Sequence, residues 1–257
     1  MRKLWIQVSC MLLAVMLVLC GCDNTPEASQ TEPSTQSTDA TDAIGQTNAT
    51  DATETVPDPS DAPLEDIFTD SAFIGDSVTL KLRNYSMATG ATGSAVYLCQ
   101  GSYGVAHAVE DTMLLNFRGD EMTPQDALAA CGAKRVFILL GMNDIALYGI
   151  DKTIENWGKL LENIRAKCPD IVIYIQSGTP IHKDGEVGSL TNENMDAYNV
   201  RLEAFAAEHG CHYIDIASQF KNSSNALAGA YCSDAFVHFT DLACKMWVGK
   251  LQECVTE

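Results

Sequence analysis

The sequence predicts an α/β domain in which helices cover both faces of a mostly parallel sheet of about five strands. Short apolar runs alternate with helical stripes from residue 64 to the end of the chain. Two of these runs, residues 136–140 and 171–175, are uninterrupted stretches of β-prone apolar residues. Such runs are typical of strands that are buried on both faces of a parallel sheet. Alternation of this kind favours a three-layer α/β/α sandwich.

The predicted elements follow in order along the chain. Strands are expected at residues 72–75, 95–99, 135–140, 171–176 and 212–216. One helix begins directly after the first strand at Ser77, and another begins after Thr123-Pro124, a capping residue followed by a first-turn proline. Further helices are expected from Asp151, around residues 195–205, and from Asp241. The apolar stripes on the last three are interpreted as core: Ile154, Trp157, Leu160, Leu161 and Ile164; Met195, Tyr198, Leu202 and Phe205; Cys244, Trp247, Val248 and Leu251.

Length and charge limit the function classes. The chain has 257 residues and a net charge of −18, enough for one domain with accessory segments and unsuited to a nucleic-acid partner. Residues 23–63 hold nine acidic residues, no Lys or Arg and few large apolar residues. A segment of this composition cannot bury enough surface to fold, so we expect a disordered tether. The folded domain is then expected at residues 64–257, as a monomer.

The first 22 residues resemble an export signal. Arg2 and Lys3 precede the apolar residues 4–19, and Leu19-Cys20-Gly21-Cys22 resembles a bacterial lipobox. The resemblance implies cleavage before Cys22 and a lipid on its sulfur, which would hold the protein at the extracytoplasmic face of the cell membrane. A plain membrane anchor is the alternative, although a segment of 16 mostly apolar residues is short for a span.

Seven cysteines lie in the predicted domain, and they do not form a metal-binding pattern. Their number is odd and no C-x-x-C pair occurs, so a zinc site of the usual spacing is not expected. We interpret most of them as small core residues and leave a disulfide in the C-terminal region open. No metal or phosphate-binding motif is found either, and no cofactor is expected.

Candidate site residues follow the ends of several predicted strands. Gly75-Asp76-Ser77 stands between the first strand and its helix, where a serine hydroxyl and free backbone N–H groups are exposed. Gly101 and Gly104 follow the second strand, and Asn143 follows the third. In a parallel sheet these ends meet at one edge, where ligands bind. Asp234 and His238 share a loop before the last helix. A glycine turn with Asp and Ser as helix caps is the alternative for the first motif.

These residue types fit acyl transfer. A serine hydroxyl is a poor nucleophile until a base removes its proton, and histidine has a suitable pKa. Backbone N–H groups and an asparagine amide can stabilise the oxyanion of a tetrahedral intermediate. An aspartate can fix the tautomer of the histidine.

The four blocks, in this order, resemble the SGNH/GDSL hydrolase family over residues 66–254 or so. The resemblance implies a flavodoxin-like sandwich and an esterase, lipase, thioesterase or carbohydrate deacetylase. It also implies that Ser77 is the nucleophile and His238 its base. The oxyanion hole would comprise the Ser77 N–H, the Gly104 N–H (with Gly101 as the alternative glycine) and the Asn143 side chain.

Two positions depart from the family pattern. Val78 replaces the leucine that follows the serine in many members, which is an acceptable apolar change. The usual last block is Asp-x-x-His, but Ala235 stands three residues before His238 and Asp234 stands four before it. Asp234 is therefore the candidate acid, provided that the loop accommodates one extra residue. Otherwise the site would be a Ser–His dyad supported by a backbone carbonyl.

The sequence thus predicts a lipid-anchored serine esterase that cleaves small acyl esters, with O-acetyl groups on glycans as the expected substrate. The reaction would pass through an acyl-serine intermediate. Residues 177–190, rich in Gly and Pro, are expected to border the pocket. The alternatives are a lipase or lysophospholipase, an acyltransferase on the same fold, and a non-catalytic surface lipoprotein that binds a glycan.

Overall fold

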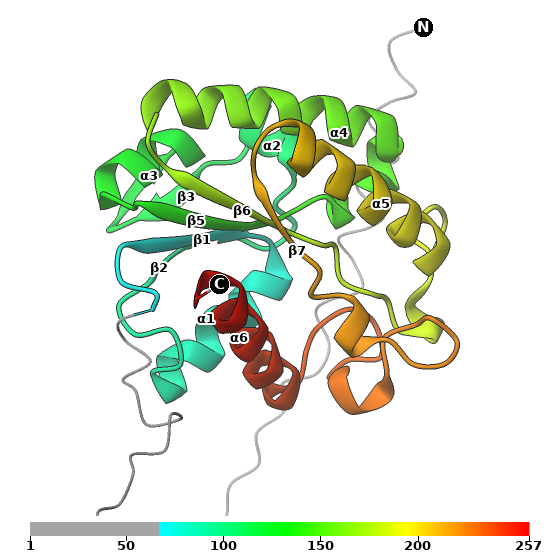
Figure 1. Cartoon of the computed structure of the whole chain (residues 1–257). Coiled ribbons are helices and arrows are strands. Elements are labelled where there is room, and N and C mark those ends of the chain that lie inside the picture. Colours follow the sequence, from blue (N-terminus) through cyan, green and yellow to red (C-terminus); the bar gives the residue numbers. More distant parts are fainter. Residues whose placement is uncertain (1–66, 257) are drawn as a thin grey trace, which may run out of the picture. The chain divides into compact units, whose positions relative to one another are not determined.

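The computed structural model describes residues 67–256, and these form a parallel five-stranded sheet with the order β2-β1-β5-β6-β7 (Figure 1). All four strand pairings are parallel. Counted along the chain, the sheet strands have the flavodoxin-like order 2-1-3-4-5, so the predicted fold is confirmed. The strands are β1 (Ser71–Gly75), β2 (Val96–Cys99), β5 (Arg135–Leu139), β6 (Val172–Gln176) and β7 (His212–Ile214).

Helices cover both faces of this sheet. One face carries α1 (Ser77–Thr89) and α6 (Asp241–Thr256) (Figure 1). The other carries α2 (Val105–Glu110), α3 (Pro124–Cys131), α4 (Met142–Lys167) and α5 (Asn192–Glu208). This is the three-layer arrangement that the alternation of strands and helices predicted.

A row of aromatic rings crosses the sheet and fixes its register. Phe73 pairs with Tyr97 on one neighbouring strand and with Phe137 on the other, and Phe137 pairs with Tyr174. The ring centroids of these pairs are 4.7–5.0 Å apart, in stacked geometry. A shift by one residue would move every ring to the opposite face of the sheet, so the row holds the carboxyl ends of the strands level.

The predicted helical stripes pack against this sheet. The side chains of Trp157, Tyr198 and Trp247 are completely buried, which confirms their assignment to the core. Their polar atoms are also satisfied. Trp157 Nε1 donates to Tyr198 Oη (2.7 Å), and Tyr198 Oη donates to the Leu140 carbonyl (2.8 Å).

The structure differs from the prediction in the first half of the domain. Helix α2 and the hairpin of β3 (Leu115–Phe117) and β4 (Asp120–Met122) were not predicted. Helix α4 begins at Met142 rather than Asp151, and a non-helical Gly149 (φ 74°, ψ 173°) kinks it. Asn143, which was expected to follow the third strand, therefore lies in the first turn of α4.

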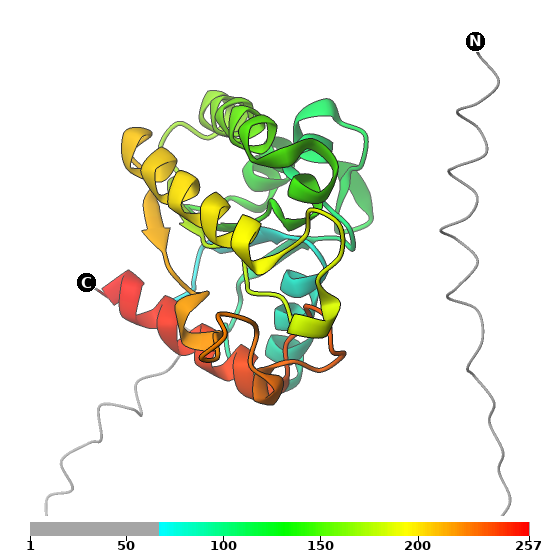
Figure 2. The same cartoon turned by 90° about the vertical axis from the view of Figure 1, so that its right-hand side faces the viewer.

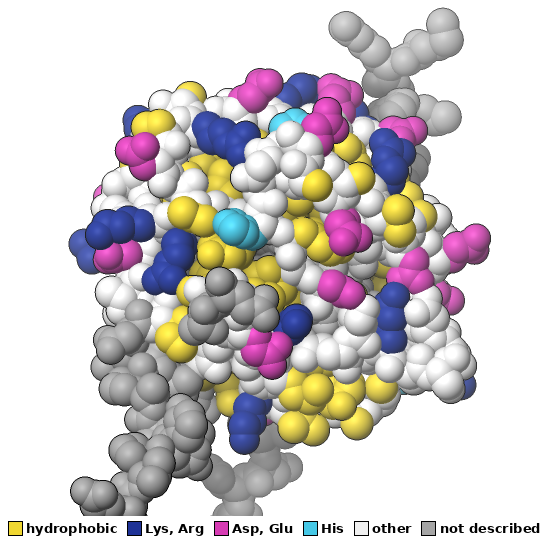
Figure 3. Space-filling view, viewed as in Figure 1, with side chains coloured by type: hydrophobic (Ala, Val, Ile, Leu, Met, Phe, Trp, Pro, Cys, Tyr) yellow, Lys and Arg dark blue, Asp and Glu magenta, His cyan; other side chains and the backbone are white. Residues whose placement is uncertain are grey.

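Within residues 67–256, no helix is long and apolar enough to cross a membrane. None of the seven cysteines of this part of the chain forms a disulfide, and only Cys244 is fully buried. Acidic and basic side chains are interspersed on the face shown in Figure 3. The predicted signal (1–22), with its lipidation site Cys22, and the predicted tether (23–63) lie outside the described residues.

Candidate active site

Ser77 is the first residue of α1, and the turn before it brings strand and helix into close contact. A Cβ atom on Gly75 would lie 1.9 Å from Thr79 Oγ1, so this turn requires glycine. Asp76 caps the helix, because its Oδ1 accepts the Val78 N–H at 2.9 Å. The N–H of Ser77, at the first helical position, has no acceptor within the helix. It is therefore available to bind negative charge.

His238 lies beside Ser77, although the two residues are 161 positions apart in the sequence. Its Nε2 is 2.9 Å from Ser77 Oγ, and its Nδ1 is 2.5 Å from Asp234 Oδ2. In Figure 2 the segment that carries Asp234 and His238 (orange to red) lies close to the start of α1 (cyan). The structure thus brings the three predicted residues into one hydrogen-bonded line.

Asp234 is held firmly within its loop. Its Oδ1 accepts the backbone N–H groups of Phe236 (2.9 Å) and His238 (3.2 Å). Partial burial acts to raise its pKa, but the hydrogen bonds from the His238 ring and from these two N–H groups hold the pKa of Asp234 below its ordinary value. Ala235 has a left-handed backbone conformation (φ 58°). With this conformation, the loop accommodates the one extra residue that separates Asp234 from His238 here.

Asn143 links the serine turn to the glycine turn after β2. Its Nδ2 donates to Asp76 Oδ2 (2.9 Å) and to the Tyr103 carbonyl (3.2 Å). Both partners are acceptors, so only the amide nitrogen can face them and the orientation of the amide is determined. The Tyr103 carbonyl belongs to the same peptide unit as the Gly104 N–H. Asn143 therefore connects Asp76 with the Gly104 peptide.

Gly104, not Gly101, lies at this position. Gly104 is buried, and a Cβ atom on it would lie 2.7 Å and 2.8 Å from the carboxylate oxygens of Asp144. Asp144 accepts the N–H groups of Val105 and Ala106, at 2.8 Å each, and so caps α2. Gly101 is exposed, with open space where its Cβ would be. Close approach of a carboxylate explains why residue 104 is glycine.

Burial disfavours the ionised form of two carboxylates at the site, those of Asp76 and Asp144. Asp76 is only 1% exposed, and burial raises the pKa of its carboxyl from 3.8 to about 6. Burial also raises the pKa of Asp144, against the opposing effect of the N–H groups of Ala106 and Val105 and of nearby His107. The sequence offers only weak signals for these contacts: Asp76 reads as a helix cap, and His107 merely follows the glycine turn.

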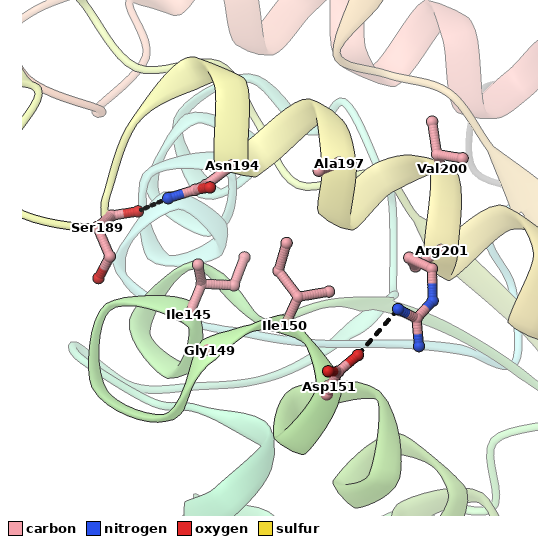
Figure 4. Close-up of a pocket in the computed structure, with 9 residues that line it drawn as sticks. All are labelled: Ile145, Gly149, Ile150, Asp151, Ser189, Asn194, Ala197, Val200 and Arg201. Carbon is pink, nitrogen blue, oxygen red and sulfur yellow. Dashed lines mark hydrogen bonds and ion pairs between the residues drawn. The ribbon is translucent and has the colours of Figure 1, made fainter.

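A groove of about 580 Å³ lies between the α4 kink and α5 (Figure 4). Its lining is apolar in part and polar at the rim, where Asp151 pairs with Arg201 at 2.9 Å. Ser189 also lines it, as does Ile145 of the first turn of α4, whereas Ser77, Asn143 and His238 do not. The lining residues are Ile145, Gly149, Ile150, Asp151, Ser189, Asn194, Ala197, Val200 and Arg201.

Among residues 67–256, no group of three or more His, Cys, Asp or Glu side chains is arranged to hold a metal ion. The chemistry that the described groups offer is proton transfer along a Ser–His–Asp line. An arrangement of this kind, at the carboxyl edge of a parallel sheet, is that of a hydrolase acting on acyl groups.

Comparison with known proteins gives the family. The model of the GDSL-like lipase/acylhydrolase family matches residues 73–245. This range includes every strand-end motif described above, and the protein belongs to this family. No curated protein sequence matches the chain.

Solved structures agree on the fold at low sequence identity. A GDSL-like lipase from Bacteroides thetaiotaomicron is 18% identical, with a TM-score of 0.56 over 72% of this chain and 87% of the other. A carbohydrate esterase family 3 protein from Talaromyces cellulolyticus is 12% identical, with a TM-score of 0.52 over 71% and 94%. An acetyl xylan esterase is 16% identical, with a TM-score of 0.51 over 71% and 98%.

Proposed function

We propose that the protein is a serine esterase with Ser77 as nucleophile, His238 as general base and Asp234 as the orienting acid. One observation carries the proposal, a continuous line of two hydrogen bonds. Asp234 Oδ2 lies 2.5 Å from His238 Nδ1, and His238 Nε2 lies 2.9 Å from Ser77 Oγ. The imidazole can take the hydroxyl proton at Nε2 while the carboxylate stabilises the positive charge that forms.

The reaction then has two halves. Ser77 Oγ attacks the ester carbonyl as its proton passes to His238, and the tetrahedral intermediate collapses when the imidazolium returns that proton to the leaving alcohol. Water, activated by the same imidazole, then hydrolyses the acyl-Ser77 ester and releases the acid. The oxyanion in both halves would be bound by the N–H of Ser77, the N–H of Gly104 and the amide of Asn143. Each such donor contributes about 3–4 kcal/mol to lowering the barrier.

The irregular Asp-to-His spacing does not weaken this proposal. An acid out of reach of His238 would favour a Ser–His dyad or a non-catalytic glycan-binding protein. Because Ala235 takes a left-handed conformation, the carboxylate of Asp234 nevertheless lies within hydrogen-bond distance of the ring. The triad is therefore the reading that the geometry favours.

For the substrate, we propose a small acyl ester, namely an O-acetyl group on a glycan. Two observations support this choice. Structures with this fold include an acetyl xylan esterase and a carbohydrate esterase. The groove between the α4 kink and α5, lined in part by Ile145 two residues after Asn143, combines apolar side chains with a polar rim, a lining that suits a sugar chain better than a purely apolar acyl chain. A lipase, a lysophospholipase and an acyltransferase are the alternatives for the same nucleophile.

A labelling experiment tests the nucleophile, and a panel of esters tests the substrate. A fluorophosphonate probe should label the wild type and fail to label Ser77→Ala. Equal labelling of both proteins, or none of either, would exclude the serine esterase. The panel should contain p-nitrophenyl esters of increasing chain length, acetylated xylan and a lysophospholipid. Fastest turnover of a long-chain ester would replace the glycan proposal by the lipase. Transfer of the acyl group to an added sugar would identify an acyltransferase.

We also propose that the mature protein begins at Cys22 and is held by lipid at the extracytoplasmic face of a bacterial membrane. The support is the sequence Leu19-Cys20-Gly21-Cys22 after an apolar segment. In cells fed a labelled fatty acid, the wild type should incorporate the label and Cys22→Ser should not. Label in Cys22→Ser but not in Cys20→Ser would move the site to Cys20.

A further inference from the structure

The donors assigned to the oxyanion hole are largely occupied in the free protein. Both hydrogens of the Asn143 amide have acceptors, one on Asp76 and one on the Tyr103 carbonyl. The Gly104 N–H donates to His107 Nδ1 at 3.2 Å. An oxyanion that forms beside Ser77 must therefore compete with acceptors that belong to the protein itself.

His107 differs from the other two acceptors in its freedom to move. Asp76 is buried and holds the cap of α1, while the Tyr103 carbonyl is part of the backbone. His107 is the third residue of the short helix α2, and its side chain is only partly buried. Its ring lies against Tyr103, with centroids 6.2 Å apart. It can turn away without moving the backbone.

The backbone around Gly104 does not depend on His107. Asp144 accepts the next two N–H groups, those of Val105 and Ala106, at 2.8 Å each. These charge-assisted bonds are stronger than a neutral bond to an imidazole. The position of the Gly104 N–H is thus set by Asp144, which leaves His107 as an acceptor that satisfies a buried N–H in the resting protein.

We propose that His107 is a positioning residue that occupies the Gly104 N–H at rest and gives it up when the oxyanion forms. The inference rests on the proposed function, because it concerns a donor of the oxyanion hole. An imidazole accepts at Nδ1 only when its proton is on Nε2. When negative charge develops on the substrate oxygen, the N–H exchanges a neutral acceptor for an anionic one. Breaking the first bond subtracts from the gain, so His107 lowers the rate.

A matched pair of variants tests this inference. His107→Phe keeps a ring against Tyr103 but has no acceptor, whereas His107→Gln keeps an acceptor at the same helical position. With p-nitrophenyl acetate, His107→Phe should raise kcat about two- to tenfold, the factor that one neutral hydrogen bond contributes, and should change KM little. His107→Gln should stay close to the wild type.

The control is His212→Phe. His212 also stacks on a tyrosine, Tyr174 at 4.7 Å, but it lies at the start of β7, at the opposite end of the strands. It should leave kcat and KM unchanged. An unchanged or lower kcat in His107→Phe would overturn the inference, as would an equal rise in His107→Gln.

A second measurement does not depend on turnover. In an NMR spectrum of labelled protein, loss of the hydrogen bond should move the Gly104 amide proton upfield in His107→Phe but not in His107→Gln. If this shift does not occur, the bond and the inference are refuted. If the wild type has no esterase activity and is not labelled by the fluorophosphonate probe, the proposed function fails instead, and the two failures can be distinguished.

Discussion

Replacing Asp76 by Asn should make the protein's stability less dependent on pH. Asp76 is 1% exposed, and burial raises its pKa from 3.8 to about 6. The folded state therefore favours the protonated carboxyl. Its contribution to stability is fully present below about pH 4 and is lost as the pH rises through 6. A difference of about two pH units corresponds to about 3 kcal/mol, since each unit is worth about 1.4 kcal/mol.

The assay is urea denaturation of the wild type and Asp76→Asn at several pH values between 4 and 7.5. The free energy of unfolding of the variant minus that of the wild type should increase by up to about 3 kcal/mol over this range. Roughly half of the increase should come above pH 5. Other titrating groups are common to both proteins and cancel in the difference. Asp120→Asn, at an exposed position of β4, is the control and should show no comparable trend.

A difference that stays constant with pH would refute the reasoning, because it would mean that the buried carboxyl has the same pKa in the folded and unfolded states. Activity gives an independent readout. Asp76 accepts from Val78 N and Asn143 Nδ2 through its two oxygens, whereas an asparagine has one oxygen and one NH2 group. One of the two donors must then face another donor. We expect kcat to fall in Asp76→Asn even where the variant is the more stable protein.

Three further predictions concern the site directly. Asn143→Ala should lower kcat about a hundredfold or more without unfolding the protein; a normal rate would remove Asn143 from the oxyanion hole. Asp234→Asn should lower kcat at least about a hundredfold. Asp241→Asn is the control, because it only breaks a surface ion pair with Lys81, and it should leave kcat within about twofold. If neither substitution lowers kcat, the site is a Ser–His dyad. Ala235→Gly should keep kcat, and Ala235→Val should lower both kcat and the thermal midpoint, because a β-branched residue disfavours the positive φ of 58°; equal behaviour of the two would contradict this account.

The central sheet could be predicted from sequence because β1, β5 and β6 are almost completely buried. Their apolar runs are uninterrupted, and the predicted ends of all five strands differ from the observed ones by two residues at most. The start of α4 was harder to predict. The residue that precedes the helix, Gly141, has no side chain that could signal a cap, and Gly149 interrupts the helix before its long apolar stripe begins. Helix α2 has only six residues, too few for a helical period to be recognised in the sequence.

For the site, sequence reasoning found the residues whose chemical type is informative, and it could not find those defined by contact. Ser77, Asn143 and His238 stand after strands or before a helix and have few other roles there. His107 and Asp144 reach the site only through the packing of α2 against α4. The conformation of Ala235 has no sequence signature, since alanine seldom adopts a positive φ. Without it, the spacing between Asp234 and His238 looked irregular.

The buried carboxylate of Asp76 is best explained by the orientation of Asn143. A helix cap alone does not require a carboxylate, because serine or asparagine would serve equally well. Burial, only partly offset by the hydrogen bond from the Val78 N–H, raises the pKa of Asp76 to about 6. This net shift destabilises the ionised form by about 3 kcal/mol at neutral pH. Only a group with acceptors on both sides can cap α1 and at the same time accept a hydrogen bond from the Asn143 nitrogen. Asp76 thus lowers the stability of the fold but fixes the orientation of one amide, as is expected of a residue at a functional site.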